Sequence, residues 1–294
     1  MDLPDHPDQG APAVILIDDA DLTHTHPRPP LHHYLKALWQ RRFFIWEDSK
    51  SKSFNDGRDT FLGGVWIFLN PLLQVAIYAL VFGLILKTSR GMDNFLGFLV
   101  IGVIFFGFFS KGINGGSALI QSQRSMITSF HFPKAALVVS SVTKQFLDNL
   151  VPALMAVILA LAFQPNVPPS WTVLLVVPLY LLTHVFIAGF EFFIARATAF
   201  VPDLKGLVNL LVRGLFFISG VFFTIDRFDT APSLRAFVEL NPIYQFLSAV
   251  RSCVIDGQAP PIEVWLYLSL WSLLTFVVGF VYFWKAEARY ASVR

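Results

Sequence analysis

Residues 114–134 read Asn114-Gly-Gly-Ser-Ala-Leu-Ile-Gln-Ser-Gln-Arg-Ser-Met-Ile-Thr-Ser-Phe-His-Phe-Pro-Lys134 and lie between two long apolar segments. The glycine pair weakens a helix that would otherwise continue. Further on, Met126, Ile127 and Phe130 fall at helical spacing on one face, and Pro133 ends the run. The stretch predicts a short amphipathic helix at one face of a membrane.

Two interpretations of this helix follow from its residues. An interfacial loop helix would only insert its apolar side among lipid headgroups. Alternatively, the same apolar side would press on a partner protein, with Gln123 and Arg124 facing elsewhere. The stretch alone favours the first interpretation, and the neighbouring segments bear on the second.

Composition places the chain in a membrane. Of its 294 residues, 55% are hydrophobic and 14% charged, and the mean hydropathy is +0.59. Soluble domains average about 25% charged residues. The net charge of +2 gives no argument for nucleic-acid binding, and a single cysteine, Cys253, excludes an internal disulfide and a cysteine metal cluster.

Apolar runs predict an all-α chain with six membrane spans. A spanning helix needs about 20 apolar residues, and suitable runs occupy residues 61–86, 94–121, 134–163, 171–195, 206–225 and 264–284. The second run exceeds this length, so its helix should break at Gly112, Gly115 and Gly116. Basic residues after the last run indicate a cytoplasmic C-terminus, and six spans place the N-terminus on the same side.

Three regions precede or interrupt the spans. Residues 1–30 form an acidic, proline-rich segment typical of a disordered cytoplasmic tail. Residues 31–60 predict an amphipathic interfacial helix and a turn, and residues 61–294 form the membrane domain. Within residues 226–263, Asn241 can cap a helix whose first position is Pro242. This helix is too short to span, which predicts a re-entrant or interfacial hairpin on the outer face.

Polar residues inside the spans leave alternatives open. Lys144 and Asp148 are four apart and can pair along a helix, unless that part of the helix protrudes from the bilayer. His184 and Glu191 share a helical face, where a proton relay is conceivable and a packed or pore-facing pair is favoured. They are also the only acid–base candidates for a membrane sugar or acyl transferase. No phosphate-binding Gly-x-x-x-x-Gly-Lys-Ser/Thr loop and no zinc-binding helix appears, which favours transport without chemistry.

Short motifs in a fixed order suggest a family. They are the Phe130–Lys134 run after the second span, Ser219-Gly-Val-Phe-Phe223 after the fifth, and Asn241-Pro-Ile-Tyr244 with Arg251 in the hairpin. From residue 31 to residue 289 the chain resembles the membrane subunits of type-2 ABC exporters for polysaccharides. The Ser-Gly pair is more similar to capsular polysaccharide exporters than to O-antigen exporters. Where many relatives carry Arg-Asp after the fourth span, this chain has Pro202-Asp203.

The resemblance implies a non-enzymatic transport subunit of the bacterial inner membrane. Two copies would form a channel for a lipid-linked polysaccharide, and two separate subunits would bind ATP and magnesium, leaving this chain without a cofactor. Periplasmic export proteins are further candidate partners, and nucleic acid is not one. The alternatives within this class are an O-antigen exporter or another lipid or drug exporter.

The resemblance also implies residue roles. ATPase coupling falls to Gln123, Arg124, Met126, Ile127, Phe130, His131, Phe132 and Pro133. The outer gate falls to Asn241, Pro242, Tyr244, Phe246 and Arg251. Candidates for lining the channel are Trp66, Asn70, Tyr78, Phe106, Phe109, Phe222 and Phe223.

Overall fold

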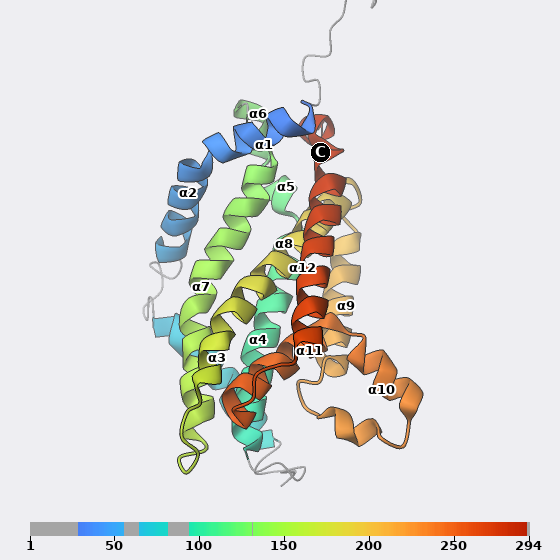
Figure 1. Ribbon diagram of the computed structural model, residues 1–294. Coiled ribbons are helices and arrows are strands. Elements are labelled where there is room, and N and C mark those ends of the chain that lie inside the picture. The colour runs from blue at the N-terminus through green and yellow to red at the C-terminus, as the bar shows by residue number, and fades with distance from the viewer. Residues whose placement is uncertain (1–28, 56–64, 82–93, 131, 293–294) are drawn as a thin grey trace, which may run out of the picture.

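Four long helices form the body of the protein. The computed structural model describes residues 29–55, 65–81, 94–130 and 132–292. Within these ranges, the helices long and apolar enough to cross a membrane are Phe95–Gly115, Ala135–Ala162, Trp171–Phe200 and Ile262–Trp284. They correspond to α4, to α7, to the short 3-10 segment η3 (Trp171–Leu175) continued by α8 (Val176–Phe200), and to α12 (Figure 1).

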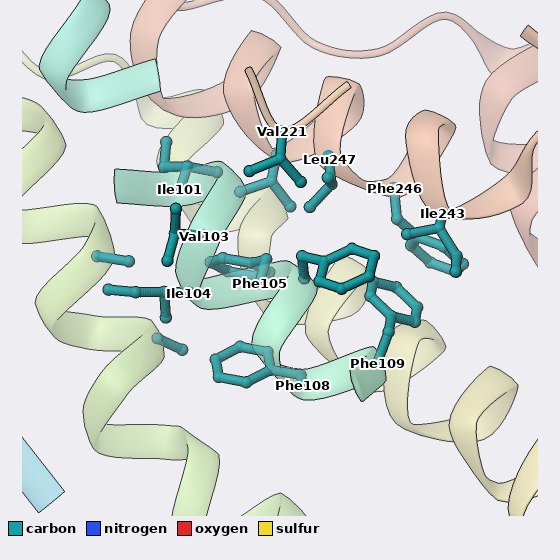
Figure 2. Packing of buried hydrophobic residues seen from close by; sticks show 14 of the residues in the cluster. Ile101, Val103, Ile104, Phe105, Phe108, Phe109, Val221, Ile243, Phe246 and Leu247 are labelled. Carbon is teal, nitrogen blue, oxygen red and sulfur yellow. The ribbon is translucent and has the colours of Figure 1, made fainter. Parts of the chain in front are cut away.

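Helix α4 is the central element. It is apolar on nearly every side, and such a helix is stable only when neighbours cover its whole circumference. Phe105, Phe108 and Phe109 are each 1% exposed. The ring of Phe109 lies 5.5 Å from that of Phe246, at the other end of the chain, and Figure 2 shows this packing.

Two glycines set the crossing of α8 and α12. A Cβ on Gly189 would lie 2.3 Å from the carbonyl carbon of Thr275, and a Cβ on Gly279 would lie 2.1 Å from the oxygen of Gly189. No side chain fits there, so the two backbones touch directly. Close backbone approach through small residues is a usual basis of helix association in membranes.

Shorter helices lie around this body. Their bounds are α1 Leu31–Gln40, α2 Arg42–Asn55, α3 Trp66–Ala79, α5 Leu119–Ser122, α6 Arg124–Ser129, α9 Leu204–Ile218, η4 Ile225–Phe228, α10 Pro232–Glu239, α11 Pro242–Arg251, η5 Ser252–Asp256 and η6 Glu287–Ser292. Helices α1 and α6 and the C-terminal segment share one end of the bundle, here named the coupling end (Figure 1). Helices α10 and α11 lie at the opposite end, named the hairpin end.

The all-helical prediction is confirmed for the described residues, which contain no strand. Four of the six predicted spans coincide with helices that are long and apolar enough to cross a membrane. The fifth is shorter than predicted, because α9 ends at Ile218 where Gly220 adopts a left-handed φ of 70°. Its 15 residues cover about 22 Å, less than the roughly 30 Å hydrocarbon core. The described part of the first predicted span holds the 14-residue α3, with Pro71 inside it.

The predicted amphipathic helix is divided into two. It breaks at Arg41, so that α1 crosses the coupling end while α2 turns down along α7 (Figure 1). The contact between α2 and α7 is polar: Ser49 Oγ donates to the carbonyl of Ser140 at 2.9 Å. On α7 itself, Lys144 Nζ lies 2.6 Å from Asp148 Oδ2, which confirms the pairing of these two residues. The predicted acidic tail lies outside the described residues, apart from Pro29 and Pro30.

Candidate coupling site

The quoted stretch folds into two short helices. Helix α4 ends at Gly115, as the glycine pair predicts, and Ala118 follows in the left-handed region with φ 67°. Helices α5 and α6 then follow one another, and the backbone is extended at Phe130. The segment from Leu119 to Pro133 is here named the coupling segment. Its last helix ends at Ser129, earlier than the predicted end at Pro133.

The apolar residues of the coupling segment divide between inside and outside. Phe130 is 67% exposed and Arg124 is also exposed. Ile127, in contrast, is 4% exposed and belongs to a buried cluster with Tyr34 and Val138. The prediction that Ile127 fills a partner's cleft is therefore wrong: its side chain holds the segment to its own chain.

The other predicted coupling residues take intermediate places. Met126 is half-buried against the same cluster, and Gln123 joins α5 to α6. Phe132 and Pro133 are half-buried in the connection to α7. His131 lies outside the described residues.

The first half of the coupling segment is fixed to α8 through Thr198. Gln121 Nε2 donates to the carbonyl of Thr198 at 2.7 Å. The backbone N–H of Ala118 donates to Thr198 Oγ1 at 3.4 Å, and that hydroxyl donates to the carbonyl of Ile194 at 2.8 Å. A displacement of α5 would therefore act on α8 as well as on α4.

The second half is fixed by a buried network, here named the anchor, of Tyr34, Lys134, Ala135 and Glu287. Tyr34 Oη donates to Glu287 Oε2 at 2.6 Å and accepts from the N–H of Ala135 at 3.0 Å. Glu287 Oε1 accepts from the N–H of Lys134 at 2.9 Å. These two N–H groups begin α7 and lack partners within the helix. The anchor thus joins α1, the start of α7 and the C-terminal segment at one point.

Burial shifts the titration of the anchor groups. Desolvation raises the pKa of the Glu287 carboxyl above its usual value, although hydrogen bonds from Tyr34 and Lys134 act in the opposite direction. Desolvation, together with the neighbouring Glu287, raises the pKa of the Tyr34 hydroxyl. Tyr34 therefore keeps its proton and remains a hydrogen-bond donor to Glu287.

Two cavities flank the coupling segment on the side of α1. One, of about 320 Å³, is lined by Arg41, Phe44, Met126, Phe130, Phe132 and Ala136. The other, of about 450 Å³, lies beside the anchor, and its lining includes Tyr34, Arg41, Phe132, Lys134 and Glu287. The exposed Phe130 and the basic Arg41 thus share an indented surface that a partner's apolar and acidic groups could fill.

The predicted channel-lining residues do not form one surface. Phe106 and Phe109 are 4% and 1% exposed, so they are core residues and cannot line a channel in this conformation. Phe222 is also buried, and its ring lies 5.3 Å from that of Tyr78. Of the remaining candidates, Asn70 is exposed, and Trp66 and Phe223 are half-buried.

The predicted gate residues form a tightly bonded corner at the hairpin end. Asn241 caps α11, because its Oδ1 accepts from the N–H of Ile243 at 3.0 Å, and Pro242 takes the first helical position as predicted. Tyr244 and Phe246 are buried. Arg251 is 5% exposed.

Arg251 holds three backbone carbonyls. Its guanidinium donates to Gly220 at 2.7 Å, to Val221 at 3.1 Å, and twice to Phe98, at 3.1 and 3.2 Å. It thereby joins α11 to the first turn of α4 and to the chain after α9. The three elements would have to move together or break these bonds.

His184 and Glu191 do not meet. Glu191 is fully buried and accepts from Gln145 Nε2 at 2.9 Å. His184 lies 3.3 Å from Asn149 Nδ2. The acid–base pair that a transferase would need is therefore not assembled, and the described residues hold no group of three histidine, cysteine or carboxylate side chains suited to a metal.

Comparison with known proteins identifies the chain's family. The model of the ABC-2 type transporter family matches residues 50–255. The O-antigen export system permease protein RfbA of Myxococcus xanthus is 24% identical over 81% of this chain and 87% of its own length. The protein of the same name from Klebsiella pneumoniae is 23% identical over 80% and 89%. The polysialic acid transport protein KpsM of Escherichia coli is 20% identical over 74% and 83%. Among the described residues, four helices are long and apolar enough to cross a membrane, which agrees with these matches. The chain belongs to the ABC-2 type transporter family.

Proposed function

We propose that this chain is the membrane subunit of an ATP-driven exporter of a lipid-linked polysaccharide. The proposal rests on the relatives that are named for polysaccharide export. Two of them align with 80% or more of the chain, and the third aligns with 74% of it. Both O-antigen and polysialic acid export occur among them. The preference for a capsular polysaccharide, which rests on Ser219-Gly220, therefore stays a prediction.

The proposed mechanism begins at the coupling segment. A separate ATP-binding subunit would take the exposed Phe130 into a cleft, and Arg124 would meet an acidic rim. Movement of the segment would pass to α8 through Thr198 and to α7, α1 and the C-terminal segment through the anchor. The coupling end would face the cytoplasm, and the chain would lie in the bacterial inner membrane.

The proposed channel lies between two copies of the chain. Support comes from α9, on which only Val208 and Val212 are buried. Large apolar side chains and Arg213 are exposed on the same helix. An arginine inside a membrane is costly unless it meets water or a polar partner. If α9 lies between a second copy of the chain and an aqueous path, the second copy covers its apolar side chains and the water solvates Arg213.

Deletion of the gene tests the function. We expect the surface polysaccharide to disappear and lipid-linked polymer to accumulate in the cytoplasm, with both effects reversed by a plasmid copy. The polysaccharide that disappears, capsule or O-antigen, identifies the substrate. Unchanged surface polysaccharide would refute the proposal.

Purified protein provides a second test. We expect the chain alone to hydrolyse no ATP, because it lacks a phosphate-binding loop. ATP hydrolysis should appear only when the separate ATP-binding subunit is added. Strong hydrolysis by the chain alone would contradict its role as a transport subunit.

A further inference from the structure

We propose that a pocket at the hairpin end binds uncharged, hydroxyl-rich sugar residues of the exported glycan. The pocket has a volume of about 720 Å³, within the range of small-ligand sites. Its lining includes Tyr244, Ser248 and Arg251 of α11, a helix at the opposite end of the bundle from α6 of the coupling segment (Figure 1). The inference rests on the proposed function, in which this end faces the outside.

Four separate parts of the chain build the pocket. They are the start of α4, the loop after α7, the segment after α9, and α11 with η5. The floor is held rigidly, because Asn94 Nδ2 donates to Gln164 Oε1 at 2.9 Å and Gln164 Nε2 donates to the carbonyl of Val254 at 3.2 Å. Arg251 fixes the remaining wall. A pocket whose walls are fixed loses little entropy when a ligand binds.

The lining combines aromatic rings with neutral polar groups. Phe163 is 42% exposed and Phe223 is half-buried, whereas the rings of Phe98 and Tyr244, which also line the pocket, are largely buried. Amides and hydroxyls come from Asn94, Gln164, Asn166, Thr224 and Ser248. Aromatic faces pack against the C–H surface of a sugar ring, while amides and hydroxyls match its hydroxyl groups.

The charges of the lining favour a neutral ligand over a phosphate. Among the described lining residues, the charged ones are Arg251 and Asp256. Arg251 already makes four hydrogen bonds to backbone carbonyls. Asp256 is exposed at the rim and would repel an anion. The lining therefore offers a phosphate no free cationic clamp, whereas a carboxylate accepts well from sugar hydroxyls.

Photocrosslinking in exporting cells tests the pocket directly. A benzoyl-phenylalanine placed at Asn166, in the lining, should give a high-mass adduct that periodate oxidation of the glycan removes. The same probe at Phe237, which is 59% exposed on α10 and outside the pocket, is the control. Equal adducts at both positions, or none at Asn166, would overturn the proposal.

A binding measurement gives the contribution of single side chains. The probe is the oligosaccharide mixture released by mild acid from the source cells' polysaccharide, observed by saturation-transfer NMR with the full chain and its ATP-binding subunit. Loss of one stacking ring or one acceptor should weaken binding by about three- to tenfold. We expect this for Phe163→Ala and for Asp256→Asn, and no change for the matched exposed controls Phe237→Ala and Glu263→Gln.

The outcomes separate the pocket from the proposed function. Inorganic diphosphate should not compete with the oligosaccharides, and competition would show an anion site instead. If deletion of the gene abolishes export while the pocket variants bind normally, the exporter assignment stands and the pocket proposal fails. If deletion leaves export intact, the exporter assignment fails first.

Discussion

Replacement of Arg251 by methionine should unfold the hairpin end. Methionine replaces the unbranched part of the side chain but has no guanidinium, so the carbonyls of Phe98, Gly220 and Val221 lose it as a donor. Each buried unsatisfied carbonyl costs about 1–3 kcal/mol. Part of this cost is offset, because folding of the variant no longer removes water from the charged guanidinium. Three such carbonyls together cost about 3–9 kcal/mol, so we expect a net loss of about 3–5 kcal/mol.

The native thiol of Cys253 reports this loss. Its side chain is 0% exposed, two residues from Arg251, so a maleimide should label it only when the hairpin end opens. Since about 1.4 kcal/mol is a factor of ten, labelling of Arg251→Met should be roughly a hundredfold faster or more. The control is Arg235→Met, whose ion pairs are exposed to solvent and contribute little to stability. Slow labelling and an unchanged thermal midpoint in Arg251→Met would refute the reasoning.

Four further substitutions test other parts of the chain. Folding raises the pKa of the Glu287 carboxyl, so its protonation stabilises the folded chain fully below its ordinary pKa, and this stability is lost as the pH rises through the pKa of the folded state. Glu287→Gln should therefore flatten the pH dependence of the thermal midpoint. An unaltered pH dependence would contradict this explanation. Phe130→Ala should impair export without lowering the thermal midpoint, whereas Ile127→Ala should lower the midpoint by removing about 2–5 kcal/mol of core packing; the reverse pattern would contradict the division between them. Gly102→Ala should destabilise the chain by about 1–3 kcal/mol, since its Cβ would lie 2.2 Å from Nη2 of Arg251, and a wild-type midpoint would show that the guanidinium can move aside.

The spans were largely predictable because long apolar runs with few charged residues leave few alternatives to a buried or lipid-facing helix. One of the two exceptions, α9, ends early at Ser219-Gly220. Hydropathy continues through Val221 and Phe223, so the apolar run alone does not mark the turn. The cap at Asn241 was predictable, since capping depends on neighbouring residues only.

The sequence predicted where the coupling segment lies, but not which of its side chains are buried and which are exposed. Helical periodicity places Ile127 and Phe130 on one face, yet α6 ends at Ser129 and the backbone of Phe130 is extended. Periodicity no longer gives the direction of a side chain beyond the end of its helix. The burial of Ile127 depends on a cluster that includes Tyr34, far away in the sequence.

The anchor was missed entirely. Glu287 lies between Lys285 and Arg289. The cytoplasmic side of the C-terminus is assigned by counting basic residues, and that count takes no account of an acidic residue. Its partners are 153 and 253 residues away, at Lys134 and Tyr34. No local sequence pattern predicts contacts between residues so far apart. A single carboxylate after an apolar span is nevertheless a position at which to look for a distant partner.

Crosslinking from position 130 tests the central claim most directly. The chain has a single cysteine, and it is buried, so Phe130→Cys adds one accessible thiol at the coupling end. A bifunctional thiol-to-amine reagent in membranes should join this variant to the ATP-binding subunit when both are expressed, and Ser233→Cys, exposed on α10 at the hairpin end, should give no such product. Absence of the product with Phe130→Cys, or its equal formation from Ser233→Cys, would contradict the assignment of this segment as the contact through which ATP hydrolysis drives export.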